Sequence, residues 1–319
     1  MSVHTLACLR RLSADHPTSG EQIAEQLALS RASVSTALAE AEQYGVALER
    51  RHGVGYRLRE PLQWLDEAVV RAALGAQTAL TLEIHQRTDS TNRRLLAEPR
   101  HGRVMAAEWQ DGGRGRLGRR WQGRLGGSLM FSLCWQFPGG AATLAGLPLA
   151  VGVLVAETLA DAGVAGIALK WPNDLLLPVG DEHAKAGGIL IEIAGDAMGP
   201  VCAVIGIGLN LQAPELEGLQ AAGLAAHGLA VDRNALLARL LTALEHGLAD
   251  FAAHGFADFR GRWEARHAWQ GRAVRLIAAD GQAREGRAMG VTDDGALRFR
   301  SDERDEVIHS GDLSLRVAA

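Results

Sequence analysis

Residues 112–121 read GGRGRLGRRW, with four glycines, four arginines and one tryptophan in ten positions. The stretch connects two strand-like apolar runs, RVMAAEWQ and SLMFSLCWQF, so it lies inside a folded domain and not in a repetitive tail. Four arginines this close repel one another unless an anion joins them, and glycines let the backbone approach a ligand closely. We therefore predict a loop that closes over a small phosphorylated ligand. A solvated turn and a disordered nucleic-acid-binding segment are the alternatives.

The bulk composition is that of an ordinary soluble protein. The 319 residues carry a formal net charge of -4 and predict two or three domains. We find no signal peptide and no uninterrupted membrane-length apolar run, so we predict a cytoplasmic protein with no membrane partner. The three cysteines, Cys8, Cys134 and Cys202, are far apart in apolar surroundings and are expected to be buried thiols. Of 33 basic residues only Lys170 and Lys185 are lysines, and both fall in unusual segments of the middle region.

The first 60 residues have the pattern of a DNA-binding unit. Residues 17–46 read as two short helices joined by a tight turn, with Ser19 or Thr18 capping the first and Ser30 the second. Residues 47–60, ALERRHGVGYRLRE, then predict two strands and a basic turn, which completes a winged-helix pattern. This unit contains seven arginines and seven acidic residues, so its charges cancel. One copy is therefore expected to bind phosphate weakly, and a dimer is expected on DNA.

Two polar segments of the middle region follow predicted strands. Residues 88–94, TDSTNRR, have the side chains of a helix cap, and the same four small polar groups suit a compact ligand head group. Residues 170–177, KWPNDLLL, are bent by Pro172, which presents Asn173 and Asp174 beside Lys170. A hairpin turn explains the Asn-Asp pair but not the Lys-Trp pair. A lysine that binds phosphate beside an Asp-Asn pair that binds magnesium is a chemically coherent alternative.

Two further segments combine glycine with polar residues. Residues 184–192, AKAGGILIE, place Lys185 just before a Gly-Gly pair that opens a buried strand, where it can reach a bound anion. Residues 205–210, IGIGLN, end a strand at Asn210, but no GxGxxG follows, so a dinucleotide-binding Rossmann site is disfavoured. From about Gly271 short strands separated by DG, DDG and SGD turns predict a small β-barrel.

Taken in order, DSTN, WQDGGRGRLGRRW, KWPNDLLL, KAGGILIE and GIGLN resemble the bacterial biotin–protein ligases. The N-terminal unit makes the chain most similar to the bifunctional members, which also repress the biotin operon. The resemblance implies an α+β protein. Its parts would be a winged helix-turn-helix domain over residues 1–62, a mixed-sheet, class II synthetase-like catalytic domain over 63–268, and an SH3-like β-barrel over 269–319.

The resemblance implies two-step chemistry: biotin and MgATP form biotinyl-5′-AMP, and a lysine of the biotin carboxyl carrier protein of acetyl-CoA carboxylase then takes the biotin. Lys185 and Arg116 would be the catalytic residues. The biotin-binding set would be Ser90, Thr91, Asn92, Gln110, Arg114, Arg116 and Lys185. The adenylate and phosphate set would be Gly113, Gly115, Arg119, Trp121, Lys170, Asn173, Asp174 and Asn210. Asp174 would also hold Mg²⁺. In the family the loop after Asn210 often caps adenine with an aromatic residue, and here that segment contains none.

The resemblance also implies a repressor that has biotinyl-5′-AMP as its corepressor. The adenylate-bound chain would form a homodimer, and the carrier protein would compete for the same sheet edge. Operator DNA would contact the helix-turn-helix over residues 20–39, through Arg31, Ala32, Ser35 and Thr36, and Arg51 of the hairpin.

Three other functions remain open at this point. The chain could be a non-catalytic biotin-sensing transcription factor, in which case biotin and ATP together release no pyrophosphate. It could be a lipoate–protein ligase, although the arginine-rich loop and the winged helix point away from that enzyme. It could also bind RNA through the arginines of residues 112–121.

Overall fold

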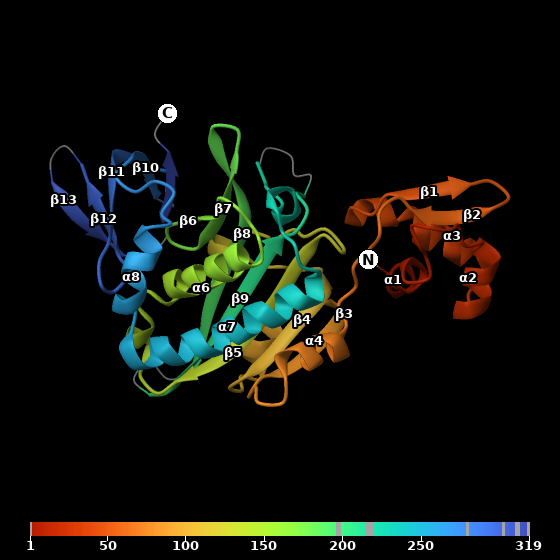
Figure 1. Ribbon diagram of the computed structural model, residues 1–319, viewed down its shortest axis with the longest axis horizontal. Helices are drawn as coiled ribbons and strands as arrows, with labels where there is room; N and C mark the ends of the chain where they lie inside the picture. The colour runs from red at the N-terminus through yellow and green to blue at the C-terminus, as the bar shows by residue number, and fades with distance from the viewer. Residues whose placement is uncertain are drawn as a thin grey trace.

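The computed structural model describes residues 2–195, 199–214, 220–278, 281–301, 304–309 and 313–317. These described residues form three sheets that follow one another in sequence and in space, with the N-terminal unit at one end and the C-terminal sheet at the other (Figure 1).

The N-terminal unit is a helix-turn-helix followed by a hairpin. The Ser19 side chain accepts a hydrogen bond from the Gln22 amide, and Ser30 accepts one from Ser33, so both predicted caps are present. Apolar side chains of the three helices described below, with Leu58 of the hairpin and Leu125 from the middle region, form a hydrophobic cluster separate from that of the central sheet. The elements are α1 (Val3–Leu9), α2 (Gly20–Leu27), α3 (Arg31–Ala39), a 3-10 turn (Ala41–Tyr44), β1 (Leu48–Arg51) and β2 (Gly55–Leu58).

The central sheet is mixed, in the strand order β3-β4-β5-β9-β8-β7-β6. Only the β3–β4 pair is parallel among its described pairings, and the other neighbours are antiparallel. The strands are β3 (Thr81–Thr88), β4 (Arg103–Gln110), β5 (Ser128–Phe137), β6 (Ala168–Lys170), β7 (Asp174–Val179), β8 (Glu182–Gly195) and β9 (Val201–Asn210).

Helices cover both faces of this sheet. Gly152 of α6 packs against Leu169 and Ile189 on one face, whereas Asn92 of α5 touches Gly206 on the other. Because neighbouring side chains on a strand point to opposite faces, the α5 face carries Gly188, Gly206 and Gly208 and is hollowed. The helices are α4 (Glu67–Leu74), α5 (Thr91–Ala97), α6 (Leu147–Asp161), α7 (Arg233–His254) and α8 (Ala257–Glu264).

Helix α6 is the apolar centre of the main core. The segment Ala141–Asp161 is long and apolar enough to cross a membrane by length and composition. However, 67% of its most apolar stretch is buried inside the protein. Most side chains of α6 are buried in the core of the protein.

The C-terminal strands form a separate antiparallel sheet in the order β13-β12-β11-β10-β14. Helix-turn-helix, mixed central sheet and C-terminal antiparallel sheet confirm the α+β class, while the SH3-like closure, the wing and the domain limits stay predictions. The strands are β10 (Ala273–Ala278), β11 (Ala283–Val291), β12 (Leu297–Arg300), β13 (Asp305–Ile308) and β14 (Leu313–Val317).

The cysteines are free thiols, as expected, but only Cys8 and Cys134 are buried, and Cys202 is half-buried. Burial, together with the neighbouring Cys202, raises the pKa of Cys134 to about 12. The Cys134 thiol is therefore neutral and behaves as a small apolar side chain.

Candidate ligand-binding and activation site

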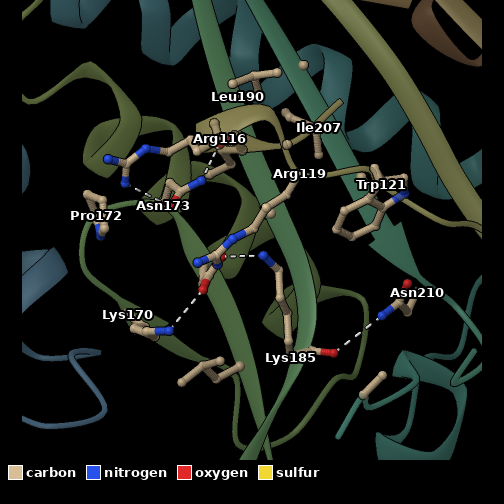
Figure 2. Close-up of a pocket in the computed structure, with 18 of the residues that line it drawn as sticks. Arg116, Arg119, Trp121, Lys170, Pro172, Asn173, Lys185, Leu190, Ile207 and Asn210 are labelled. Atoms are coloured by element: carbon tan, nitrogen blue, oxygen red, sulfur yellow. Dashed lines mark hydrogen bonds and ion pairs between the residues drawn. The ribbon is translucent and has the colours of Figure 1, made fainter. Parts of the chain in front are cut away.

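One cavity of about 1130 Å³ opens on the glycine-rich face of the central sheet. Its walls come from the start of α5, the arginine-rich loop (residues 112–121), the β6–β7 turn, strands β8 and β9, and residues of the C-terminal sheet. The volume lies slightly above the usual range for small-molecule sites, about 300–1000 Å³. Figure 2 shows Arg116, Arg119 and Trp121 on one side of this space, with Lys170 and Lys185 below them.

At one end of the cavity lies a set of neutral polar side chains, the amide–hydroxyl cluster (Thr91, Asn92, Gln110 and Ser132). The Gln110 side-chain oxygen accepts from the Thr91 amide at 2.9 Å, which joins the end of β4 to the start of α5. The Ser132 hydroxyl lies 2.6 Å from both the Thr91 hydroxyl and the Asn92 side-chain oxygen, and with one proton it donates to one of them at a time. Thr91, Asn92 and Ser132 are buried. The predicted helix cap and the predicted head-group site are thus the same segment, in which Ser90 caps α5.

Two members of this region were missed from sequence. Ser132 sits in the otherwise apolar run SLMFSLCWQF, and Glu192 interrupts the apolar strand GGILIEIAG. Glu192 accepts from the Asn92 amide at 2.9 Å and pairs with Arg114 at 2.9 Å. A polar residue in the middle of a mostly apolar strand was the available signal in both cases. The Arg114 guanidinium, predicted to contact biotin, pairs here with a carboxylate of the protein.

At the other end lies a charged set, the lysine–aspartate cluster (Lys170, Asp174 and Lys185). The Asp174 carboxylate binds the Lys185 ammonium at 2.5 Å and the Lys170 ammonium at 3.1 Å (Figure 2). Burial alone would raise the pKa of Asp174, but the two ammonium groups outweigh it and hold that pKa below its usual value. Burial lowers the pKa of Lys170 and is only partly offset by Asp174. The chain has therefore placed both of its lysines around one carboxylate.

The position of Lys185 differs from the expectation in one respect. Strand β8 begins at Glu182, so Lys185 lies within the strand and not before it. The register with β7 shifts between Leu175 and Leu176, so that Leu176 pairs with Lys185 while Leu175 pairs with Gly187. The Gly-Gly pair was predicted to open the strand, but it lies inside β8. Extended backbone accommodates glycine within a strand.

The segment KWPND forms the tight connection between β6 and β7. The Trp171–Pro172 peptide bond is cis, so Pro172 bends the chain as predicted. The buried Trp171 indole donates to the carbonyl of Gly295, in the turn between β11 and β12, at 3.2 Å. Asn173 donates to the Ile189 carbonyl at 2.7 Å and accepts from Arg116 at 3.4 Å. Arg116 of the arginine-rich loop is thus brought to the ionic end of the cavity.

Asp174 does not fit a metal ion held by the protein. Both of its carboxylate oxygens are bound to lysine ammonium groups. Over the described residues, no group of three or more His, Cys, Asp and Glu side chains is placed to hold a metal. A divalent cation beside two ammonium groups is electrostatically unfavourable.

The arginine-rich loop has its own hydrogen bonds. The Gly115 amide donates to the Arg119 carbonyl at 2.8 Å, and the Trp121 amide donates to the Gly113 carbonyl at 2.9 Å. A Cβ on Gly113 would lie 2.6 Å from the Trp121 carbonyl oxygen, so glycine is required there. Leu117 takes a left-handed conformation with φ 57° at the tip. The backbone bonds make the loop a folded hairpin, which excludes the disordered-tail alternative.

Trp121 and Asn92 explain the two glycines of the IGIGLN segment. A Cβ on Gly208 would lie 2.5 Å from the Trp121 ring, and one on Gly206 would lie 2.2 Å from the Asn92 side-chain oxygen. Among the described residues, neither the buried indole nitrogen of Trp121 nor the buried side-chain oxygen of Asn210 has a hydrogen-bond partner. Buried polar atoms of this kind are normally satisfied, and both residues line the cavity, so polar groups of a bound molecule are expected to reach them.

Asn210 ends β9 and donates to the Lys185 carbonyl at 3.3 Å (Figure 2). In the following segment, predicted to order over adenine, residues 215–219 lie outside the described residues. Pro214, Gln220 and Ala221 line the cavity on either side of them.

The predicted DNA-contacting residues lie on α3 and on the hairpin. Arg31, Ala32 and Thr36 are exposed on α3, and Ser35 is half-exposed. Arg51 of β1 pairs with Glu49 at 2.6 Å, and Arg57 of β2 pairs with the same carboxylate. The hairpin therefore carries less free positive charge than its arginines alone indicated.

Each of the three parts of the chain is similar to a known protein family. The chain matches the Biotin/lipoate A/B protein ligase family over residues 84–210, an HTH domain over 4–57 and the Biotin protein ligase C terminal domain over 271–316. It is 34% identical to the bifunctional ligase/repressor BirA of Escherichia coli K12, over 94% of this chain and 93% of that protein. It is 35% identical to the biotin--[acetyl-CoA-carboxylase] ligase of Mycobacterium tuberculosis, over 81% of this chain and 97% of that one.

A solved structure shows the same fold. The biotin protein ligase from Aquifex aeolicus in complex with biotin and ATP matches with a TM-score of 0.64 and 29% identity, over 74% of this chain and 99% of that chain. The chain belongs to the biotin protein ligase family, in the branch that joins the ligase to a helix-turn-helix repressor domain. The expectation of a biotin ligase that is also a repressor is thus confirmed.

Proposed function

We propose that the cavity binds biotin and ATP side by side, joins them as biotinyl-5′-AMP, and passes the biotin to a lysine of the biotin carboxyl carrier protein of acetyl-CoA carboxylase. One observation carries the proposal: a single cavity has neutral amides and hydroxyls at one end and two lysines at the other. Biotin has the matching polarity, with a neutral ureido ring at one end and a carboxylate at the other.

At the neutral end, Ser90, Thr91, Asn92 and Gln110 would hold the ureido ring. The bonds of Asn92 to Glu192 and to Ser132 fix its amide, so its contribution is a rigid, shaped wall. Arg114, held by Glu192, would close this end above the ring.

At the ionic end, the biotin carboxylate oxygen attacks the α-phosphorus of ATP, the α–β phosphoanhydride bond breaks, and pyrophosphate leaves. Two anions must meet in this step, so fixed cations stabilise the charge that accumulates in the transition state. Lys185 would lie between the carboxylate and the α-phosphate. Lys170 and Asn173 would contact the other phosphates, with Arg116 reaching over from the loop.

In the second step, the amine of the carrier lysine attacks the acyl carbonyl, and AMP leaves with the bonding electrons. The arginine-rich loop would protect the mixed anhydride until then, because a closed site excludes water. Gly113 and Gly115 let the loop backbone approach the ligand, and Arg119 and Trp121 would cover the nucleotide. The unpaired Trp121 indole and Asn210 oxygen supply one donor and one acceptor for it.

Magnesium would enter with the phosphates of ATP and not through Asp174, whose oxygens are bound to lysines. We assign Asp174 the task of holding Lys170 and Lys185 together before the anions arrive. The C-terminal sheet, proposed to close as an SH3-like barrel, adds Arg272 and Arg316 to the cavity wall.

For repression, α3 would enter the major groove of the operator and the β1–β2 hairpin would act as the wing. Arg31, Ala32, Ser35 and Thr36 of α3, with Arg51 of the hairpin, would make the contacts. The balanced charge of this unit supports a homodimer as the DNA-binding species, formed when biotinyl-5′-AMP is bound.

The proposal is tested by incubating the full chain with ATP, labelled biotin and an apo carrier domain, and scoring label on the carrier lysine. We expect transfer that requires ATP and that releases pyrophosphate. Binding of biotin without pyrophosphate release would favour the sensor alternative, and faster transfer of lipoate than of biotin would identify a lipoate ligase.

A further inference from the structure

The side-chain amide of Asn92 is oriented by a carboxylate outside the cavity. Its Nδ2 group donates to the Glu192 carboxylate at 2.9 Å and to the Leu190 carbonyl at 3.3 Å. An amide nitrogen has two N–H donors and a carboxylate only accepts, so the oxygen and nitrogen of this amide cannot exchange places without losing both bonds. The Oδ1 atom lies 2.6 Å from the Ser132 hydroxyl and keeps a second lone pair. Asn92 therefore has an acceptor, and not a donor, left to offer.

The remaining acceptor of Asn92 is open to the cavity. Asn92 and Gly206 both line this space. A Cβ on Gly206 would lie 2.2 Å from Asn92 Oδ1, so a larger residue at position 206 would cover that oxygen or displace it. Glycine leaves the oxygen accessible to a ligand.

Glu192 is itself held in place from the other side. Its second carboxylate oxygen pairs with the Arg114 guanidinium at 2.9 Å, and the Glu192 side chain is only 20% exposed. On β9 it lies opposite Val204, which packs with Leu95 of α5 in one hydrophobic cluster. Among the described residues that line the cavity, Glu192 is not included. It therefore acts on a ligand through Asn92 and Arg114.

Gln110 is oriented in a similar way but presents the opposite group. Its side-chain oxygen accepts from the Thr91 amide at 2.9 Å and from the Thr91 hydroxyl at 3.3 Å. The amide nitrogen of Gln110 is thus the side left for a ligand in the cavity. Asn92 and Gln110 together offer one acceptor and one donor, which complement an N–H group beside a carbonyl.

We propose that Glu192 is a positioning residue that makes the neutral end of the cavity select a head group with an N–H donor. The inference rests on the proposed function, because it takes the ureido ring of biotin as the occupant of this end. That ring has two N–H groups beside its carbonyl, whereas the dithiolane ring of lipoate has none. A site with a fixed hydrogen-bonding group discriminates against a ligand that cannot pair with it, because a buried polar group is then left unsatisfied.

The test measures binding of biotin to the full chain by calorimetry without ATP. Biotin is compared with the two analogues in which a ring oxygen replaces one or the other ureido N–H group. We expect the wild type to bind at least one analogue about 100-fold more weakly than biotin, because the Asn92 oxygen then meets another acceptor. In Glu192→Leu, which frees the Asn92 amide to turn, this ratio should fall to about tenfold or less.

Glu83→Leu is the matched control. It removes a carboxylate that pairs with Arg103 on the same sheet, away from the cavity, and should keep the wild-type ratio. An unchanged ratio in Glu192→Leu, or an equal fall in Glu83→Leu, would overturn the inference and leave the proposed function intact. So would a wild type that binds both analogues as tightly as biotin. A wild type that binds biotin no better than lipoate would instead overturn the proposed function.

Steady-state kinetics give a second readout. Glu192→Leu should raise the KM for biotin about tenfold and leave the KM for ATP and the rate at saturating biotin unchanged. An equal rise in both KM values would mean general disruption of the site and would overturn the selective role.

A second variant keeps the test open should Glu192→Leu fail to fold. Glu192→Gln is nearly isosteric, and its own amide nitrogen can turn toward Asn92, so the ratio between analogue and biotin should fall about threefold. An unchanged ratio in Glu192→Gln would then contradict the inference.

Discussion

The two ends of the cavity lie on the same glycine-rich face but satisfy their polar groups differently. At the neutral end, the amide–hydroxyl cluster is hydrogen-bonded within itself, so its shape exists before a ligand arrives. At the ionic end, one carboxylate holds two ammonium groups that would otherwise repel each other. The neutral end is therefore suited to recognise the shape of a ligand. At the ionic end, Asp174 is the partner of the two lysines until anionic groups of the ligands replace it. Removing a group should therefore affect binding at one end and chemistry at the other.

The largest effect is expected at the ionic end. Lys185→Ala should slow adenylate formation about 10²–10³-fold, the usual result of removing one contact to transition-state charge, about 2.7–4 kcal/mol. Pyrophosphate release under saturating biotin and ATP measures it, and circular dichroism should show an unchanged fold. Near-normal turnover of this variant would remove Lys185 from the chemistry.

The second-largest effect concerns the free energy of unfolding, and it arises where β6 contacts residues 266–268. The Leu169 amide donates to the Arg266 carbonyl and the Leu169 carbonyl accepts from the Ala268 amide, which places the intervening His267 beside Leu169. Burial lowers the pKa of His267 from 6.5 to about 4, so this imidazole is neutral in the folded protein.

Because the folded pKa lies below the unfolded one, the unfolded chain binds the extra proton between pH 6.5 and 4. Stability should therefore fall as pH drops through this window, by about 3 kcal/mol at most from this residue. Urea unfolding at several pH values should show a smaller acid loss for His267→Gln than for the wild type. Equal slopes for the two proteins would mean that His267 is not the group that titrates.

At the neutral end, Asn92→Ala should raise the KM for biotin about 10- to 100-fold, because it leaves buried partners unsatisfied at a cost of about 1–3 kcal/mol. The rate at saturating biotin and the KM for ATP should change little. Ser132→Ala is the milder comparison, since Ser132 supports Asn92 from behind. A selective loss of ATP affinity in Asn92→Ala would reverse the assignment of the two ends.

The smallest effect concerns the loop that spans both ends. Arg116→Gly should release free biotinyl-5′-AMP about tenfold faster, equivalent to about 1.4 kcal/mol, and the leaked intermediate should label bystander lysines. Mass spectrometry of an added bystander protein detects this labelling. Undiminished retention in Arg116→Gly would count against closure by the loop.

Local signals predicted much of the fold. Caps at Ser19 and Ser30 located two helices because a cap is satisfied by its own neighbours. The bend at Pro172 was also predictable from the local sequence, because proline cannot continue a regular central strand. The position of Lys185 inside β8 was not predictable, because the shift that admits it arises from pairing with β7.

Contacts between segments that are distant in the chain could not be predicted from the sequence. Ser132 and Glu192 complete the neutral end from strands far from residues 88–94 in the chain, and nothing local shows what they face. From the sequence, the glycines at 206 and 208 were weak evidence for a ligand site. The structure explains them, because Asn92 and Trp121 pack where their side chains would lie. Leu125 reads as a loop residue, yet it is buried in another unit.

The most direct test of the whole account is a crystal structure of this chain with biotinyl-5′-AMP. The account predicts the ureido ring beside Asn92 and Gln110, the acyl phosphate at Lys185, and the arginine-rich loop closed above them. A ligand lodged elsewhere, or a loop pointing into solvent while the adenylate is bound, would contradict it.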